Sequence, residues 1–297
     1  MKYLNLSAIA ILFFALALTS CSDDDSSQPN TQPLALNLQG LTDLGDGFAY
    51  EGWLIVDGAP VTTGVFTVNA AGELSRTTFD IDTETLANAT TFVLTIEPSP
   101  DNDPAPSDVH ILAGDFNANA ATLTVGHPAA IGDDFTASTG KYILATPTDG
   151  AGDALNERSG VWFLDPAAGP GAGLNLPTLA AGWAYEGWAV IDGTPVSTGI
   201  FTELNASDGS GIYSGSEGAP PFPGEDFLNN APEGLTFPVD LAGKTIVISV
   251  EPVPDNSPAP FVLKPLVGNV PTGAIDHTAY DLGNNATATN PTGTVER

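Results

Sequence analysis

Hydrophobic positions along this chain fall into short runs that are separated by turn residues. Residues 48–56 are rich in aromatic and β-branched side chains, Asp57-Gly58 follows, and residues 61–68 form a second such run. Asp-Gly readily takes the positive φ angles of a tight turn, so the pattern predicts a β-hairpin. The same pattern surrounds Asp192-Gly193 and predicts a second hairpin.

Two apolar runs, 92–96 and 246–250, are nearly unbroken and have the length of a strand. We expect both to be central strands that are buried on both faces. The prolines that follow each run end the ladder, because proline has no N–H to donate. Further short strands are predicted at residues 110–113, 123–125, 141–146 and 161–164.

The chain contains an internal duplication. Residues 49–67 and 184–202 are identical at 13 of 19 positions, and residues 92–107 and 246–261 at 9 of 16. The offsets are 135 and 154, so the second copy has 19 more residues between the blocks. They fall within residues 203–244, where glycine and proline runs predict a long surface loop.

This pattern predicts an all-β fold of two tandem, immunoglobulin-like β-sandwich domains. The first repeat with a connecting hairpin is expected at residues 34–173, and the second repeat at residues 174–297. The segment 141–166 includes a strand around Trp162 that has no equivalent after the second copy. We expect this segment to pack at the junction and to cover an apolar edge.

The N-terminal residues are typical of an export signal. Lys2 precedes an apolar stretch, and Leu18-Thr19-Ser20-Cys21 resembles the bacterial lipobox. Residues 1–20 are therefore predicted to be a cleaved lipoprotein signal peptide, and Cys21, which is the only cysteine, to be lipidated. Residues 21–33 are predicted to form an acidic polar tether.

The acidic run after Cys21, Ser22-Asp23-Asp24-Asp25, resembles the signal that exports lipoproteins to the cell surface in Bacteroidetes-type bacteria. We therefore expect a lipid-anchored protein of the outer membrane that is exposed at the cell surface. The alternative interpretation of the run is the solvated start of a flexible linker.

Composition excludes several classes of function. The chain has 36 acidic and 7 basic residues, a formal charge of −29, so a nucleic-acid partner is not expected. No glycine-rich loop that ends in Gly-Lys-Ser or Gly-Lys-Thr indicates a nucleotide site. One cysteine and three histidines do not make an ordinary zinc site, and no Gly-x-Ser-x-Gly elbow occurs. No cofactor and no catalytic residue are expected.

Paired acids are the remaining candidates for chemistry. Glu51 and Glu97 recur as Glu186 and Glu251. Two carboxyl groups about 5 to 9 Å apart can cleave glycosidic bonds. However, an enzyme seldom needs the same pair in both halves of a tandem, so we expect structural acids and no enzyme activity.

The proline loops supply the candidate interaction residues. They contain Asp101, Asn102 and Asp103 in the first copy, and Asp255 and Asn256 in the second. Their spacing is typical of Asx turns. Calcium binding at Asp101 and Asp103 is a weaker alternative, because neither loop completes a calcium-loop pattern. Trp183 is the tryptophan that we expect to be exposed.

The repeated blocks resemble the extracytoplasmic C-terminal domain of anti-sigma-K factors. The resemblance covers about half of each repeat. The matching residues are Tyr50, Trp53, Asp57, Gly58, Pro60, Gly64, Phe66, Glu97, Pro98, Pro104 and Pro106 in the first copy, and Tyr185, Trp188, Asp192, Gly193, Pro195, Gly199, Phe201, Glu251, Pro252, Pro258 and Pro260 in the second.

The resemblance implies a β-sandwich that works outside the cytoplasm in sensing or interaction. In that family a cytoplasmic domain that grips a sigma factor and one membrane helix precede the sandwich, whereas here a lipid anchor is expected in their place. We expect a non-enzymatic protein that contacts an extracytoplasmic protein or matrix component. Two alternatives remain, a carbohydrate-binding or glycan-processing surface lipoprotein and an accessory regulator of sigma-factor signalling.

The predicted anchor can be tested at its single acceptor. In cells fed radiolabelled palmitate, the wild-type chain should incorporate label, and Cys21→Ala should incorporate none because no other cysteine exists. Label in the variant, or none in the wild type, would contradict the prediction. Ser20→Ala serves as a control with the cysteine intact.

Overall fold

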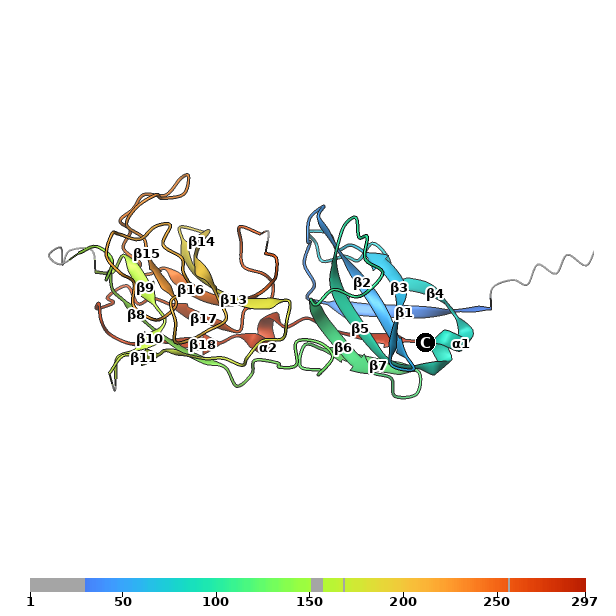
Figure 1. Ribbon diagram of the computed structural model, residues 1–297. Helices are drawn as coiled ribbons and strands as arrows, with labels where there is room; N and C mark the ends of the chain where they lie inside the picture. The colour runs from blue at the N-terminus through green and yellow to red at the C-terminus, as the bar shows by residue number, and fades with distance from the viewer. Residues whose placement is uncertain (1–29, 151–156, 168, 256) are drawn as a thin grey trace, which may run out of the picture. The chain divides into compact units, whose positions relative to one another are not determined.

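The structure is a computed structural model that describes residues 30–150, 157–167, 169–255 and 257–297. The fold is nearly all β and consists of two sandwich-like domains, as predicted (Figure 1). Cys21, with the signal and most of the tether, and Asn256 lie outside the described residues. Within the described ranges, no helix is both long and apolar enough to cross a membrane.

The first domain is built on an eight-stranded antiparallel sheet in the order β3-β2-β5-β6-β7-β19-β1-β4. Its elements are β1 (Thr31–Gln39), β2 (Phe48–Val56), β3 (Ala59–Phe66), β4 (Thr78–Asp82), α1 (Thr83–Asn88), β5 (Ala89–Pro98), β6 (His110–Asp115), β7 (Ala120–Thr124) and β19 (Thr292–Glu296).

The second domain is built on a nine-stranded antiparallel sheet in the order β14-β13-β16-β17-β18-β8-β9-β15, with β12 also paired to β8. Its strands are β8 (Thr139–Leu144), β9 (Gly160–Trp162), β12 (Leu174–Asn175), β13 (Trp183–Ile191), β14 (Thr194–Phe201), β15 (Gly224–Asp226), β16 (Thr245–Pro252), β17 (Leu266–Asn269) and β18 (Tyr280–Asn284). A two-stranded ribbon of β10 (Leu164–Asp165) and β11 (Gly171–Ala172) interrupts the segment from β9 to β12, and α2 (Ala286–Thr289) follows β18.

The predicted hairpins and central strands are confirmed. Asp57 and Gly58 have φ angles of 51° and 80°, and Asp192 and Gly193 have 52° and 87°, so each dipeptide makes the tight turn that its residue types favour. β5 and β16 each lie between two other strands, and their apolar runs are buried on both faces.

The two hairpins share a local irregularity that requires glycine. The register between β2 and β3 shifts after Gly52, and that between β13 and β14 shifts after Gly187. A Cβ atom at Gly52 would collide with the side chains of Thr63 and Phe92, and one at Gly187 with those of Thr198 and Phe163. The close approach of these side chains explains why both copies keep glycine at this point.

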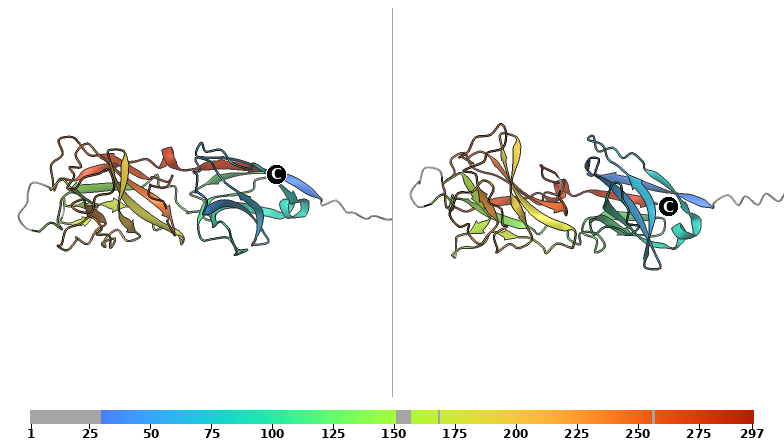
Figure 2. Two further views of the ribbon diagram at one scale, coloured as in Figure 1. Left: turned by 90° about the horizontal axis from the view of Figure 1, so that it is seen from above. Right: turned by 45° about the horizontal axis from the view of Figure 1, so that its top comes forward.

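Each sheet is completed by a strand from the other repeat. β8 follows the first repeat along the chain but pairs with β18 and β9 of the second sheet, whereas β19 follows the second repeat and pairs with β7 and β1 of the first. In Figure 1 the red strand near the C-terminus accordingly lies among the blue and green strands of the first domain, and the two views in Figure 2 agree. The tandem repeats have therefore exchanged their last strands.

Sequence and register show that β8 and β19 are equivalent. The pattern Thr-x-x-Thr-Gly stands at residues 136–140 and again at 289–293. Gly140 opposes Leu282 in β18, and Gly293 opposes Leu123 in β7. On the other side Gly140 opposes Leu174, and Gly293 opposes Leu38. β8 therefore occupies in the second sheet the position that β19 occupies in the first, with the glycine of each strand opposite a leucine on both sides.

Two asparagines fasten the segments that cross between the domains. Asn284 Nδ2 donates hydrogen bonds to the carbonyl oxygens of Phe135 and Ser138, at 2.8 and 2.9 Å. Asn290 Nδ2 donates to the carbonyl oxygen of Asp134 at 2.8 Å. The two segments that cross between the sheets are therefore hydrogen-bonded to each other.

The sheets divide the chain differently from the predicted ranges 34–173 and 174–297. The segment 141–166, expected to cover an edge at the junction, instead supplies β8, β9 and β10 to the second domain. β1 begins at Thr31, inside the range assigned to the tether. The expected surface loop within 203–244 contains the buried strand β15, because Glu225 and Asp226 form internal hydrogen bonds there.

The strand exchange predicts which domain depends on the C-terminal residues. Deletion of residues 290–297 should speed amide exchange in β1 and β7 by roughly 100-fold or more, since both lose a ladder partner, while β13 and β16 stay protected. Gly293→Ala should act in the same direction, because its Cβ would lie 2.7 Å from the Asn37 carbonyl oxygen.

Hydrogen–deuterium exchange with mass spectrometry measures this pattern. Gly273→Ala is the matched control, because a Cβ atom there meets no atom within 4 Å. Lost protection in β9 and β18 in place of β1 and β7 would show that the strands are not exchanged in solution.

Candidate functional site

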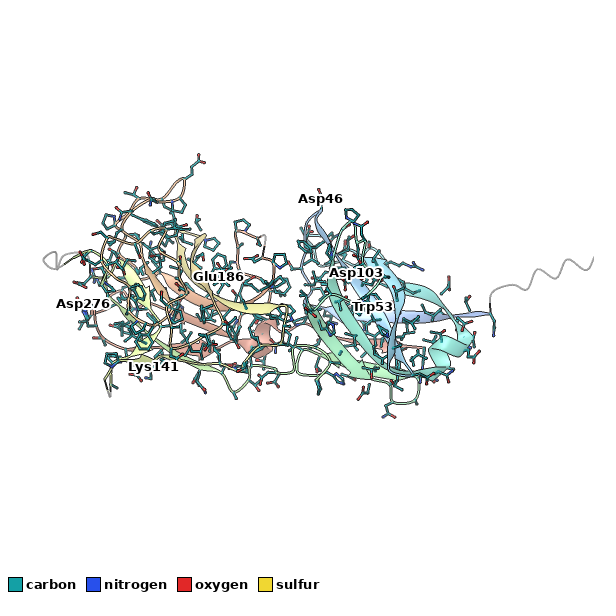
Figure 3. All side chains as sticks on the ribbon, viewed as in Figure 1. Asp46, Trp53, Asp103, Lys141, Glu186 and Asp276 are labelled. Carbon is teal, nitrogen blue, oxygen red and sulfur yellow. The ribbon has the colours of Figure 1, made fainter. Side chains whose placement is uncertain are left out.

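A pair of glutamates lies on the same two neighbouring strands in both domains. In the first domain Glu51 opposes Thr95 and Glu97 opposes Ala49, between β2 and β5. In the second, Glu186 opposes Ser249 and Glu251 opposes Ala184, between β13 and β16. Side chains two residues apart share a sheet face, so each register brings the two acids onto one face. Figure 3 labels Glu186 in the second domain.

All four acids are buried. Glu51, Glu97, Glu186 and Glu251 are 8, 2, 4 and 1 % exposed. A buried carboxylate is costly unless donors or cations surround it, so its partners decide what it can do.

In both domains a tryptophan and a hydroxyl hold one acid of the pair. Trp53 Nε1 donates to Thr95 Oγ1 at 2.9 Å, and Thr95 donates to Glu97 Oε1. In the second domain Trp188 Nε1 donates to Ser249 Oγ at 2.8 Å, and Ser249 donates to Glu251 Oε1. The duplication has therefore kept a hydrogen-bonded chain, not only a sequence pattern.

The two copies differ at the second oxygen of this acid. In the first domain the Ser107 N–H lies 2.9 and 3.1 Å from the two carboxylate oxygens of Glu97, so both are bonded. In the second domain the equivalent N–H of Phe261 donates to Glu251 Oε1 at 2.8 Å. Glu251 Oε2 and Glu186 Oε2 are buried without a hydrogen-bond partner in the described residues.

Burial shifts the pKa values of the glutamates more in the second domain than in the first. Desolvation, followed by the nearby charge of Glu251, raises the pKa of Glu186 to about 8, although a hydrogen bond from Ser197 opposes the shift. Desolvation raises the pKa of Glu251 to about 7 against the hydrogen bonds from Ser249 and Phe261. In the first domain the pKa of Glu51 is also raised, chiefly by desolvation.

A further acidic pair in the second domain is fully bonded. Asp226 accepts Trp162 Nε1 at 2.7 Å through Oδ1, and the Thr148 N–H at 2.8 Å through Oδ2. Glu225 accepts hydrogen bonds from Ser214 and Ser210. Because these oxygens all have donors, the pair fastens β15 to the loop that contains Thr148. The sequence patterns did not single out either acid, since the first repeat has no matching block.

The acids of the two proline loops have different surroundings: Asp101 and Asp103 make turns only, whereas Asp255 also lies near two buried glutamates. Asp101 Oδ1 accepts the Asp103 N–H at 2.9 Å, and Asp103 Oδ1 accepts the Ala105 N–H at 3.0 Å, the Asx turns that the spacing predicts. Asn102 is exposed between them. Asp255 makes the same turn to the Ser257 N–H at 2.8 Å, but a carboxylate oxygen of Asp255 also lies within 4.8 Å of oxygens of Glu186 and Glu251.

The expectation that Trp183 is exposed is wrong. Its side chain is 3 % exposed, and its ring centroid lies 6.0 Å from that of Phe261. Trp53, Trp162 and Trp188 are likewise buried. Tryptophan therefore provides no exposed stacking surface for a sugar ring.

One comparison with known proteins gives a match. Residues 25–110 match the model of the family described as "Anti-sigma-K factor rskA, C-terminal". The matched segment includes Glu51 and Glu97 and lies within the first domain and the residues before it. No curated protein and no solved structure matches the chain. The first domain is thus similar to the C-terminal domain of anti-sigma-K factors.

The raised pKa of Glu186 predicts how stability depends on pH. The folded carboxyl holds its proton up to about pH 8, whereas the unfolded one releases it near the ordinary glutamate pKa of 4.5, so stability falls as the pH rises through this window. Glu186→Gln removes this loss and retains the acceptor for Ser197. In EDTA it should raise the free energy of unfolding at pH 9 by about 1 to 3 kcal/mol, and change it little at pH 4.5.

Urea unfolding followed by tryptophan fluorescence at both pH values checks this prediction. Glu51→Gln is the matched control in the first domain and should give a smaller gain. Destabilisation by Glu186→Gln at pH 9 would show that the fold stabilises the ionised carboxylate, and would contradict a raised pKa of Glu186.

Proposed function

We propose that the chain is a lipid-anchored extracytoplasmic binding protein in which two domains of the anti-sigma-K C-terminal type contact a protein or matrix component of the cell envelope. The match of residues 25–110 to that family carries the proposal. The export signal and Cys21 support a location outside the cytoplasm. In the proposed arrangement the lipidated Cys21 keeps both domains at the outer membrane, displayed on the cell surface.

The buried acids support binding in place of catalysis. A glycosidase needs two carboxyl groups that flank the substrate bond. Here Glu51 and Glu97 are buried and bonded to hydroxyl and backbone donors. Glu186 and Glu251 are equally inaccessible to a sugar. The repeated pair is therefore better explained as part of the scaffold.

The end strands β3 and β14 are the best candidates for the contact surface. Each ends the strand order of its sheet. Val65 in β3 and Ile200 in β14 occupy equivalent positions and are 55 and 45 % exposed. Exposed apolar side chains on an end strand favour association with a partner strand or an apolar surface.

A regulatory role in sigma-factor signalling is the second candidate, and the family match favours it. The lipid anchor would restrict this chain to the envelope side of such a pathway. Transcription profiling of a deletion strain under envelope stress separates the two candidates. An unchanged transcription profile would contradict the regulatory role and would be consistent with the contact function.

Photo-crosslinking on intact cells tests the proposed contact surface. A photoreactive phenylalanine analogue at Val65 or Ile200 should attach an envelope protein, whereas the same analogue at exposed Ile275, on a loop of the second domain, should attach much less. Mass spectrometry identifies what is attached. Equal labelling at all three positions would contradict a role of the end strands, and retention of the chain by a polysaccharide with no protein attached would favour carbohydrate binding.

A further inference from the structure

Three carboxyl groups meet at one point of the second domain. Glu186 on β13, Glu251 on β16 and Asp255 in the loop after β16 each bring one oxygen to within 4.8 Å of the other two. Two oxygens on opposite sides of a calcium ion are about 4.6 to 5.2 Å apart, since Ca²⁺–O distances are about 2.3 to 2.6 Å. Oxygens that bind one ion therefore lie no more than about 5.2 Å apart, and the three oxygens of this cluster meet that condition.

Two buried oxygens in this cluster lack partners. Glu186 Oε2 and Glu251 Oε2 receive no hydrogen bond in the described residues, although their side chains are 4 and 1 % exposed. Their other oxygens are engaged, Glu186 Oε1 by Ser197 and Glu251 Oε1 by Ser249 and Phe261. Buried polar atoms are rarely left unbonded, so these two oxygens point to a ligand.

The surrounding charges point to a cation. Oxygens of Glu186 and Asp255 lie within 4.8 Å of each other, and two neighbouring acids are favoured by a proton or a cation between them. The ammonium group of Lys264 acts on Glu251 and offsets one of the three negative charges. When the ion has displaced the protons and all three carboxyls are ionised, two negative charges remain, which matches the charge of one divalent ion.

We propose that Glu186, Glu251 and Asp255 bind one Ca²⁺ ion. Each side chain contributes one carboxylate oxygen, and water completes the shell of six to eight ligands that this ion takes. Asp255 is partly exposed and provides the side from which the ion and its water enter. Three carboxylate ligands with water correspond to a dissociation constant of about 0.1 to 1 mM, as in extracellular calcium modules.

The first domain provides a natural comparison. Its equivalent residues are Glu51, Glu97 and Asp101, and they form no such cluster in the described residues. Both oxygens of Glu97 are bonded to the Ser107 N–H, and Asp101 is exposed in its Asx turn. The site is therefore specific to the second copy and goes beyond the proposed contact function.

Calcium titration of the full-length chain in detergent tests the proposal. After treatment with EDTA and its removal, CaCl₂ titrated at pH 8 should release or absorb heat with a stoichiometry of one. About 10 mM CaCl₂ should raise Tm by ~3 to 5 °C, because the ion binds only the folded state. MgCl₂ at the same concentration should shift Tm less, since Mg²⁺ requires shorter and more regular coordination.

Matched variants locate the binding. Asp255→Asn and Glu186→Gln should each lower calcium affinity at least tenfold and remove most of the Tm shift. Asp101→Asn and Glu51→Gln, at the equivalent positions of the first domain, should leave both unchanged. Asp255 is partly exposed, so its variant should fold even if the buried one does not.

Two outcomes would overturn the proposal. The first is the absence of both binding heat and a Tm shift, which would mean that protons alone neutralise the cluster. The second is an equal shift with MgCl₂, or a shift that Asp255→Asn retains, because either result would indicate general screening of the strongly acidic chain.

Discussion

Both domains depend on the backbone hydrogen bonds of two exchanged strands, because β8 and β19 each pair with strands of the other repeat. β19 lies between β7 and β1, and β8 lies between β18 and the segment of β9 and β12, so neither sheet is continuous without a strand from the other repeat. A strand that lies inside a sheet satisfies its N–H and C=O groups on both sides, and its loss exposes two edges. The two domains are thus two sheets but not two independent stretches of chain.

Local patterns in the sequence predicted the elements well. Residues 48–56 form β2, and both Asp-Gly turns have the expected backbone angles. These features depend on residue types a few positions apart, which a sequence displays directly. The exchange was not predictable in this way. β8 and β19 have the same Thr-x-x-Thr-Gly pattern and the same register against leucine, so local chemistry fits each strand to either sheet.

The duplication in the sequence identified the glutamate pairs, but it did not show that the two copies differ in how their carboxylate oxygens are hydrogen-bonded. Their environments diverge because the Ser107 N–H bonds both oxygens of Glu97, whereas the Phe261 N–H bonds one oxygen of Glu251. This difference depends on how each loop places one backbone N–H, and a pattern of residue types does not display it. Trp183 was expected to be exposed because it lies beside the boundary between the repeats, yet the ring of Phe261, at the end of the second proline loop, packs against it.

The position of β19 also fixes the order in which the protein is completed. A chain that emerges from the ribosome presents β1 to β7 first, but their sheet stays open between β7 and β1 until the whole second domain has followed. The first domain to appear is therefore the last to be finished, and its closure requires a contact of very long sequence separation. During that interval the unpaired edges of β7 and β1 are open to other chains, so association between incomplete chains is most favoured before β19 has formed.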